Sequence, residues 1–484
     1  MTGAPMLDLI IEGGCVIDGT GAPRWRADVG IAAGRIAGIG DLSAVPARER
    51  FDARGRIVAP GFIDVHTHDD RLLLDTPTGA HPKLSQGVTT VVTGNCGISL
   101  APLKAPATLP APLDLLGTDA WRFNSFGDYL NELEQSGPAV NAACLVGHST
   151  LRVRRMDRLD RAATAGEERL MANDLAEALE AGAIGMSTGL YYPPAKAAST
   201  QEVIAVGAPL THAAGVITMH IRDESDAIDD ALREALLIGR ALGVDTVLSH
   251  HKLVGKANHG RSVETLAMIE QAAKGQAVCF DCYPYNASST MLLPARVAQS
   301  DDVRVTWSKA DASAAGQSLF ALARERGVTP EQLALDLQPA GAIYFAMSED
   351  DVSRILSHPM AMVGSDGLAH DVSPHPRLWG TFPKVLGHYV RERRLFSLEA
   401  AVYKMTGLSA RRFGLQGRGV LAQGHHADVV VFDEQQVADR ATFANPTEVS
   451  TGIDAVFVNG RLACRDGHTM DVHAGRVLRH GRSP

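Results

Sequence analysis

Residues 57–68 read IVAPGFIDVHTH, a short apolar run that closes on a His-Thr-His triplet. Residues i and i+2 of a β-strand point to the same face and lie roughly 7 Å apart. The imidazoles of His66 and His68 can therefore approach one metal ion. The run predicts a buried strand with two candidate metal ligands at its carboxyl end.

Seven further apolar runs of similar length follow along the chain. They cover residues 89–94, 142–147, 183–188, 215–219, 245–249, 277–283 and 361–366. Helical patterns lie between most of them, and the pattern at 164–182 starts with the capping-box pair Thr164 and Glu167. Short buried strands that alternate with helices are typical of a parallel sheet. Eight of them predict an α/β protein with a catalytic (β/α)8 TIM-like barrel, which we place at residues 61–414.

The two ends of the chain differ from this middle part. Short β-branched runs broken by glycine occur at residues 8–21, 27–41, 417–433 and 453–467. They predict one small β-sandwich domain built from residues 1–60 plus 415–484. Residues 285–346, between the seventh and eighth runs, predict an insertion that covers the active site, because barrel active sites lie on the loops after the strands.

Composition and charge exclude several classes of protein. The 484 residues carry a formal charge of −9, whereas a nucleic-acid-binding protein needs a basic footprint. No run reaches the roughly 18 apolar residues of a membrane span. The six cysteines are too sparse for a disulfide framework, and no signal-peptide pattern precedes them. We expect a cytoplasmic protein with reduced thiols and no nucleic-acid or membrane partner, and the oligomeric state is left open.

Side chains with metal-binding chemistry follow five of the eight predicted strands. They are His66 and His68 after the first run, Cys96 after the second, His220 after the fifth, His250 after the sixth and Asp366 after the eighth. Each has a common structural explanation when taken alone, such as an inert buried thiol for Cys96 or a helix cap for Asp366. Together they favour a metal centre, because the carboxyl ends of all barrel strands meet at one face.

A second cysteine motif does not favour metal or redox chemistry. Cys279 and Cys282 stand in the order CFDC within the seventh run. A thioredoxin-type motif would open a helix, and a zinc ribbon would need a second cysteine pair. The CFDC motif lies inside a predicted strand and has no second pair.

The whole pattern resembles the amidohydrolase superfamily. The resemblance rests on PGFIDVHTH (60–68), His220, His250, Asp366, GHHADVVVFD (424–433) and VFVNG (456–460). Within that superfamily, further phrases are similar to the N-acyl-D-amino-acid deacylases, also called D-aminoacylases. These are TGNCGISLAPL (93–103), GHSTLR (147–152), STGLYYPP (187–194), SHHKLVGK (249–256), CYPYNASSTM (282–291) and GSDGLAHD (364–371).

The resemblance implies a zinc cofactor. One tightly held zinc would be bound by Cys96, His220 and His250. His66 and His68 would form a second, weaker position that shares Cys96. Many superfamily members bridge two metals with a carboxylated lysine on strand four, but here that strand reads GAIGMSTGL (182–190) and has no lysine. The Cys96 thiolate is the available substitute, and a thiolate suits zinc.

The implied reaction is hydrolysis of the amide bond of N-acyl-D-amino acids to a carboxylate and a free D-amino acid. Asp366 would act as general base and then acid, taking a proton from metal-activated water and passing it to the leaving amine. Tyr192 is expected to donate a hydrogen bond to the oxyanion. The resemblance assigns the substrate α-carboxylate to Lys252, Tyr283, Ser289 and Arg377.

The sequence leaves the preferred substrate side chain open. The family places an apolar pocket near Tyr344 and Met347, which favours D-methionine, D-leucine or D-phenylalanine derivatives. Arg296 could instead receive the acidic side chain of an N-acyl-D-glutamate-type substrate. A hydantoinase-like cyclic-amide hydrolase is disfavoured by the missing lysine and by the phrase around Cys96. A non-catalytic scaffold is disfavoured because all five metal candidates and the base are present.

Overall fold

A computed structural model describes residues 6–75, 79–104, 109–117, 120–470 and 473–481. Its centre is a parallel sheet of eight strands in the order β18-β14-β13-β12-β11-β10-β7-β6. The strands are β6 (Phe62–Asp64), β7 (Val88–Thr93), β10 (Asn141–Gly147), β11 (Gly185–Gly189), β12 (Val216–His220), β13 (Thr246–Leu248), β14 (Val278–Cys282) and β18 (Ala361–Val363). Each lies within or overlaps one predicted run. The predicted α/β barrel class is confirmed.

The sheet closes at the seam between β18 and β6. A parallel bridge joins Thr67 to Gly367, and the Asp366 amide donates to the His66 carbonyl at 2.8 Å. The first and last strands of the barrel therefore meet beside two candidate metal ligands.

Helices and short elements connect the strands. The helices are α1 (Phe126–Ser136), α2 (His148–Arg155), α3 (Ala165–Ala181), α4 (Pro193–Lys196), α5 (Thr200–Gly207), α6 (Pro209–Ala213), α7 (Ile228–Leu242), α8 (Ser262–Ala273), α12 (Glu349–Ser357), α13 (Arg377–Lys384), α14 (Leu398–Met405) and α15 (Gly407–Arg412). The short elements are β8 (Leu103–Lys104), β9 (Arg122–Phe123), η1 (Leu84–Gln86), η2 (Leu113–Leu116), η3 (Lys256–Asn258) and the π-helix η5 (Val385–Glu392). Thr164 and Glu167 form the predicted capping box before α3. Helix α3 buries Met171, Leu175 and Leu179 in the large apolar cluster around the barrel.

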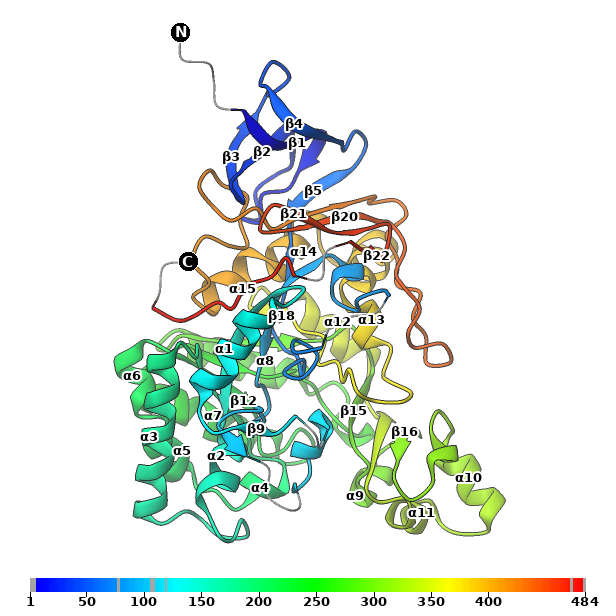
Figure 1. Ribbon diagram of the computed structural model, residues 1–484. Coiled ribbons are helices and arrows are strands. Elements are labelled where there is room, and N and C mark those ends of the chain that lie inside the picture. Colours follow the sequence, from blue (N-terminus) through cyan, green and yellow to red (C-terminus); the bar gives the residue numbers. More distant parts are fainter. Residues whose placement is uncertain (1–5, 76–78, 105–108, 118–119, 471–472, 482–484) are drawn as a thin grey trace.

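Both ends of the chain contribute to a second, nine-stranded mixed sheet. It contains β1 (Leu7–Val16), β2 (Trp25–Ala32), β3 (Arg35–Gly40), β4 (Ala47–Asp52), β5 (Ile57–Pro60), β19 (Val429–Phe432), β20 (Ile453–Val458), β21 (Arg461–Arg465) and β22 (His468–Thr469). Strand β5 pairs with β19, so segments far apart in the sequence lie side by side in the blue and orange-red part of Figure 1. Side chains of both ends, including Ile11, Val29 and Val431, share one apolar cluster.

The first predicted run proves to be two strands rather than one. Strand β5 belongs to the terminal sheet and β6 belongs to the barrel, with Gly61 between them. A Cβ atom at Gly61 would lie 2.2 Å from the Thr89 side chain, so the chain passes from one sheet to the other at a point where only glycine fits. The uninterrupted apolar pattern hides this change of sheet because both strands are buried.

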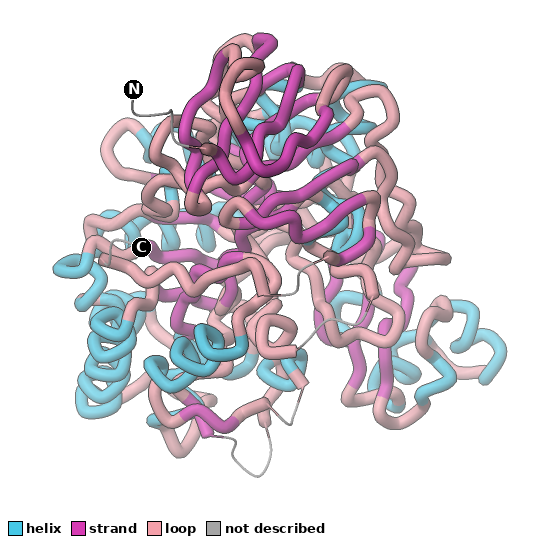
Figure 2. Tube along the Cα trace, turned by 45° about the horizontal axis from the view of Figure 1, so that its top comes forward, coloured by secondary structure: helices cyan, strands magenta, loops and turns pink. Residues whose placement is uncertain are grey.

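Residues within the predicted insertion form a separate lobe beside the barrel (Figure 2). Its elements are β15 (Ala287–Met291), α9 (Pro294–Val297), β16 (Asp302–Ser308), η4 (Ala312–Ala314), α10 (Leu319–Arg326), α11 (Pro330–Asp336) and β17 (Ala340–Phe345). The three strands form an antiparallel sheet in the order β15-β17-β16 over an apolar cluster of their own. The Tyr192 hydroxyl, from the loop after β11, lies 3.0 Å from Thr290 Oγ1 of this lobe. The lobe thus contacts the carboxyl face of the barrel.

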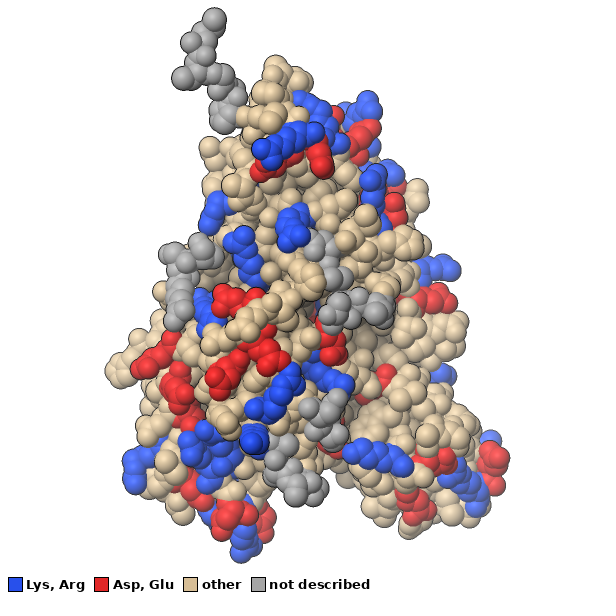
Figure 3. All heavy atoms as spheres, viewed as in Figure 1, with Lys and Arg blue, Asp and Glu red and all other residues tan. Residues whose placement is uncertain are grey.

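The surface mixes both signs of charge. Figure 3 shows Lys and Arg side chains interspersed with Asp and Glu over the terminal sheet, the barrel and the lobe on the face in view. None of the helices in the described part of the chain is long and apolar enough to cross a membrane.

Candidate metal centre and substrate site

The predicted metal ligands meet at the carboxyl face of the barrel. Their side-chain atoms form two groups whose members lie within 4.8 Å of one another, and every member is buried. The first group is Cys96, His220 and His250, and the second is His66, His68, Cys96 and Asp366. The structure therefore brings all six residues together from five strand ends, with Cys96 shared between the groups.

The first group offers one sulfur and two nitrogen donors. Cys96 Sγ lies 3.4 Å from His250 Nε2, and His250 Nε2 lies 2.9 Å from His220 Nδ1. Burial alone would raise the pKa of the Cys96 thiol, but the imidazoles of His66 and His250 hold this pKa well below its usual range. A thiolate with two imidazoles is a donor set that zinc favours, so the residues fit that metal.

The second group places the aspartate beside the two histidines of the HxH triplet. His66 Nε2 lies 3.3 Å from Cys96 Sγ and 3.6 Å from Asp366 Oδ1. His68 Nε2 lies 3.3 Å from the same carboxylate oxygen. These four groups form a second possible metal position that shares the sulfur.

The local backbone at this face is unusual. Cys96, His250 and Asp366 are non-glycine residues with φ values of 54°, 38° and 50°. Such left-handed conformations cost free energy and persist only where the surrounding structure enforces them. At the end of β11, a Cβ atom on Gly189 would lie 2.1 Å from the Cys96 carbonyl oxygen. Strand β11, the fourth of the barrel, thus ends in a glycine that makes room for the loop that carries Cys96.

Asp281 is a site residue that the sequence analysis missed. It lies on β14 inside the CFDC motif, and its carboxylate is 3.3 Å from His66 Nδ1. It also accepts a hydrogen bond from the His250 amide at 2.9 Å. A carboxylate at Nδ1 holds the proton there and leaves Nε2 free to bind a metal. Burial raises the pKa of both Cys279 and Cys282 to about 12. Neither thiol belongs to a candidate metal group among the described residues, whereas Asp281 contacts two of the ligands.

Glu224 is the second site residue that the sequence analysis missed. Its buried carboxylate lies 3.1 Å from His250 Nδ1, accepts a hydrogen bond from Arg296 at 3.1 Å and forms an ion pair with Lys252. Burial opposes its charge, but Lys252 and His220 hold the pKa of Glu224 well below its usual range. A metal on His250 Nε2 requires the proton on Nδ1, where Glu224 can accept it. The sequence contains one signal for this residue: Glu224 stands four residues after His220, in the loop that follows a strand with a metal ligand at its end.

Asp366 is held by a guanidinium as well as by the histidines. Arg377, the first residue of α13, lies 2.8 Å from Asp366 Oδ2. Burial alone would raise the pKa of the Asp366 carboxyl. The positive charge of Arg377 and, to a lesser extent, the hydrogen bond with His68 instead hold this pKa well below its usual range. The carboxylate is therefore ionised at neutral pH, with Oδ2 on Arg377 and Oδ1 facing the histidines.

The four residues that the resemblance assigns to the α-carboxylate of the substrate also lie near this face. Lys252, Tyr283, Ser289 and Arg377 each contact another residue of the protein. Arg377 donates to the Ser289 carbonyl at 3.1 Å and lies 4.6 Å from the centre of the Tyr283 ring. The Ser289 hydroxyl donates to the Ala342 carbonyl at 3.3 Å. Lys252 is paired with Glu224 and lies 5.7 Å from the Tyr283 ring.

A buried cation lies beside Tyr344, one of the two residues predicted to line an apolar pocket. The guanidinium of Arg296 lies 5.0 Å from the centre of the Tyr191 ring and 5.5 Å from that of Tyr344. The Tyr344 hydroxyl donates to the Met291 carbonyl at 2.7 Å, which fixes the position of its ring. Met347 Sδ lies 3.9 Å from the Tyr283 hydroxyl. Aromatic and thioether side chains therefore lie near one positive charge in this part of the site.

Tyr192 lies beside the first metal group. The centre of its ring is 4.8 Å from that of His220, and burial raises the pKa of its hydroxyl well above the usual value. The hydroxyl thus keeps its proton and can act as a donor.

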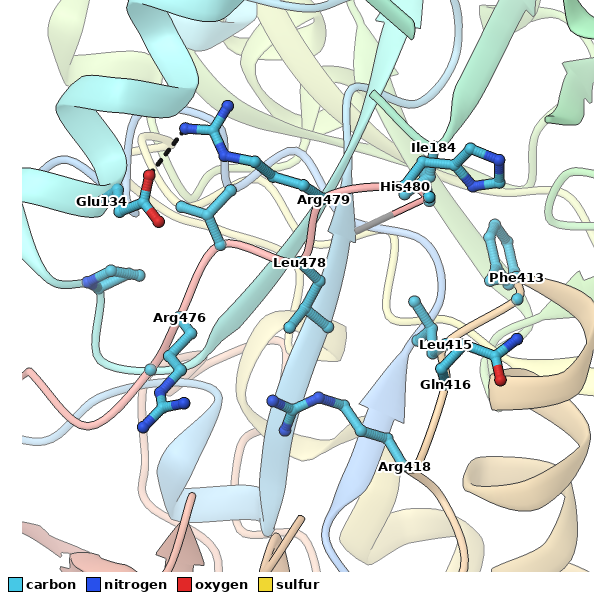
Figure 4. Close-up of a pocket in the computed structure, with 15 residues that line it drawn as sticks. Glu134, Ile184, Phe413, Leu415, Gln416, Arg418, Arg476, Leu478, Arg479 and His480 are labelled. Carbon is cyan, nitrogen blue, oxygen red and sulfur yellow. Dashed lines mark hydrogen bonds and ion pairs between the residues drawn. The ribbon is translucent and has the colours of Figure 1, made fainter. Parts of the chain in front are cut away.

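A cavity of about 770 Å³ lies at the other end of the barrel (Figure 4). Ile184, which immediately precedes β11, lines it together with Phe413, Leu415 and residues 475–481. Arg479 on its wall pairs with Glu134 at 2.8 Å. No candidate metal ligand is among the described residues that line this cavity, so the chemistry belongs to the carboxyl face.

Known proteins share both the sequence and the fold. Residues 49–463 match the profile of the amidohydrolase family. A D-aminoacylase of Alcaligenes xylosoxydans xylosoxydans is 54% identical over 472 residues, which cover 97% of this chain and 97% of that protein.

Two solved structures superpose on almost the whole chain. A D-aminoacylase from a study of its binuclear metal centre, with one-metal activation and second-metal attenuation, has a TM-score of 0.95 at 55% identity. The N-acyl-D-glutamate deacylase of Bordetella bronchiseptica, in complex with zinc and a phosphonate that mimics the tetrahedral intermediate, has a TM-score of 0.94 at 49% identity. Each alignment covers 98% of this chain and 100% of the other.

The resemblance found in the sequence is therefore confirmed by a family match over most of the chain and by relatives that align over nearly all of it. The chain belongs to the amidohydrolase family, in the group that contains D-aminoacylase and N-acyl-D-glutamate deacylase.

Proposed function

We propose that the protein is a zinc-dependent hydrolase that splits N-acyl-D-amino acids into a carboxylate and a free D-amino acid. The observation that carries the proposal is the convergence of Cys96, His220 and His250 beside the ionised carboxylate of Asp366. The D-aminoacylase at 54% identity supports the substrate class.

One zinc ion is assigned to Cys96, His220 and His250, and a second, weaker position to His66 and His68 with the shared sulfur. Asp281 supports this assignment, because it directs the proton of His66 away from the nitrogen that faces the sulfur. Glu224 lies 3.1 Å from His250 Nδ1 and pairs with Lys252, whose Nζ lies 2.8 Å from the same nitrogen, and we assign it the same role at His250. When bound, zinc would polarise the amide carbonyl and acidify a water molecule.

Asp366 is the proton carrier of the proposed reaction. Its Oδ1 takes a proton from the attacking water and delivers it to the nitrogen of the leaving amine. Arg377 holds Oδ2, so only one oxygen of the carboxylate needs to move protons. Tyr192, which keeps its proton, donates a hydrogen bond to the oxyanion that develops on the carbonyl.

The α-carboxylate of the substrate is assigned to Lys252, Arg377, Tyr283 and Ser289. Lys252 and Arg377 carry two positive charges, which pair with the Glu224 and Asp366 carboxylates. Arg296 shares the Glu224 carboxylate with Lys252, so these three cations face two carboxylates and can pair with a carboxylate of the substrate.

Two substrate side-chain classes fit the pocket. Tyr344 and Met347 provide apolar surface for D-methionine, D-leucine or D-phenylalanine derivatives. The buried Arg296 guanidinium between Tyr191 and Tyr344 favours a second candidate, an N-acyl-D-glutamate or N-acyl-D-aspartate.

A hydrolysis panel tests the proposal. It contains N-acetyl derivatives of methionine, leucine, phenylalanine, glutamate and aspartate in both D and L forms, and a hydantoin. We expect turnover of D substrates alone. Turnover of the hydantoin alone, or of the L forms alone, would refute the proposal. An R296M variant that loses acidic but keeps apolar substrates would assign Arg296 to the acidic side chain.

We further place the enzyme in the cytoplasm, because the proposed zinc ligand Cys96 must stay a free thiolate and all six cysteines are free. Residues 285–346 are proposed to cover the bound substrate, and the contact of Thr290 with Tyr192 supports this.

A further inference from the structure

The seam between β6 and β18 carries a buried lysine that the proposed reaction does not use. Lys83 lies just before η1, and its side chain is completely buried. Its ammonium donates to Asp64 Oδ2 at 2.9 Å and to Ser365 Oγ at 2.8 Å, and it lies 3.4 Å from Asp69 Oδ2. Asp64 and Asp69 belong to the β6 side of the seam, whereas Ser365 belongs to the β18 side. One ammonium therefore joins the two edges of the barrel.

The same network fixes the backbone on both sides of Asp366. The Ser365 amide donates to Asp64 Oδ1 at 2.8 Å, and the Gly367 amide donates to the Ser365 hydroxyl at 3.2 Å. Between them, the Asp366 amide donates to the His66 carbonyl at 2.8 Å. Three successive amides are thus held, which is what a residue with a φ of 50° needs to keep a strained conformation.

The seam needs this support because its strand pairing is sparse. In the described part of the chain, neighbouring barrel strands share ladders of several residue pairs, whereas β6 and β18 meet through the Thr67–Gly367 bridge. The separations of Asp366 Oδ1 from His68 and His66 are 3.3 Å and 3.6 Å, and both are measured across this seam. A shift of one edge against the other would change them directly.

We propose that Lys83 is a positioning residue for Asp366, and that it acts by clamping Asp64 to Ser365 across the barrel seam. The proposal rests on the proposed function for its kinetic readout, but its structural readout is independent. The ammonium does not touch the substrate; it sets where the proton-carrying carboxylate stands relative to the two histidines. Burial opposes the charge on Lys83, yet Asp64 and Asp69 raise its pKa above the usual value, so the clamp is charged.

Two variants of the full-length zinc-loaded protein test this role. S365A removes the hydroxyl that receives the ammonium and leaves the Lys83–Asp64 ion pair intact. The double variant D64N/K83M removes the ammonium together with its nearest carboxylate, and leaves Asp69, which lies 3.4 Å from the ammonium, as the remaining buried acid of the network. K404M is the matched control, because Lys404 is also buried but donates to carbonyl groups of His358 and Ala361 at the amino end of β18.

For both S365A and D64N/K83M we expect kcat to fall about 10- to 100-fold while KM changes by less than about threefold, because misplacement of a reacting group by about 1 Å costs this much. Crystal structures of the two variants should show Asp366 displaced from His68. K404M should lower thermal stability and change neither readout.

Wild-type kcat in both variants would overturn the proposal, and so would a lowered kcat with Asp366 in its wild-type position. If D64N/K83M does not fold, S365A alone decides the question. A wild-type protein that hydrolyses no N-acyl-D-amino acid would refute the proposed function, whereas the position of Asp366 in the S365A crystal would still test the role of Lys83.

Discussion

Replacement of Glu224 by glutamine should weaken zinc binding, because this carboxylate supports a proposed zinc ligand from behind. Glu224 lies 3.1 Å from His250 Nδ1 and is 3% exposed, so water cannot replace it easily. Glutamine keeps the shape of the side chain but removes the negative charge beside Nδ1, where Lys252 Nζ also lies at 2.8 Å. Loss of such a supporting group costs about 10- to 100-fold in metal affinity, which corresponds to about 1.4–2.7 kcal/mol.

The same substitution should also reduce stability. Lys252 and Arg296 both pair with Glu224, and removal of their shared carboxylate leaves two buried cations without that partner. We expect the free energy of unfolding of the metal-free protein to fall by about 3–5 kcal/mol. Stability alone therefore cannot distinguish a metal-supporting role from a structural one, and the zinc dissociation constant is the deciding quantity.

The assay is a zinc competition titration against a chromophoric chelator, with E202Q as the matched control. Glu202 is also buried and pairs with a histidine and an arginine, His148 and Arg152, but it contacts no candidate ligand. E202Q should lose stability and keep the wild-type zinc dissociation constant. A zinc dissociation constant of E224Q within about twofold of wild type would refute the reasoning, because the predicted loss is at least about tenfold.

Two further predictions concern Asp366 and acid stability. D366N should keep the tightly bound zinc and lose about 10²- to 10⁴-fold in kcat, because it removes proton transfer and spares Cys96, His220 and His250; near-wild-type turnover with one zinc per chain would contradict this. Burial and then Lys83 lower the pKa of His81 from 6.5 to about 3, so below pH 6.5 the unfolded chain takes up a proton that the folded protein refuses. Stability is therefore lost as the pH falls, by about 2 kcal/mol between pH 7 and pH 5 for this residue. Urea unfolding of the metal-free protein at both pH values measures this loss, which H81N should reduce; an equal loss in H81N would disprove the assignment.

Much of the fold could be predicted because two local signals coincide. Each barrel strand is a short apolar run, and the carboxyl ends of parallel strands meet at one face whatever the loops do between them. His66, His220 and Asp366 could therefore be placed together although they stand far apart in the sequence. The change of sheet at Gly61 could not be predicted, because buried strands on either side of it have the same apolar pattern.

The supporting carboxylates could not be predicted for a related reason. Glu224 and Asp281 gain their roles from contacts with His250 and His66, which follow other strands of the barrel. Such pairs follow from loop paths and from the register of neighbouring strands, which a single sequence does not report. The same holds for Lys252 and Arg377, whose side chains the sequence presents as free cations and the structure pairs with Glu224 and Asp366.

X-ray absorption at the zinc edge of the protein loaded with one zinc ion per chain tests the central claim most directly. The account predicts one sulfur at about 2.3 Å and nitrogen ligands at about 2.0–2.1 Å. The sulfur signal should disappear in C96A, together with tight zinc binding and turnover. A wild-type spectrum with only nitrogen and oxygen ligands, or a sulfur signal that survives in C96A, would contradict the assignment of Cys96.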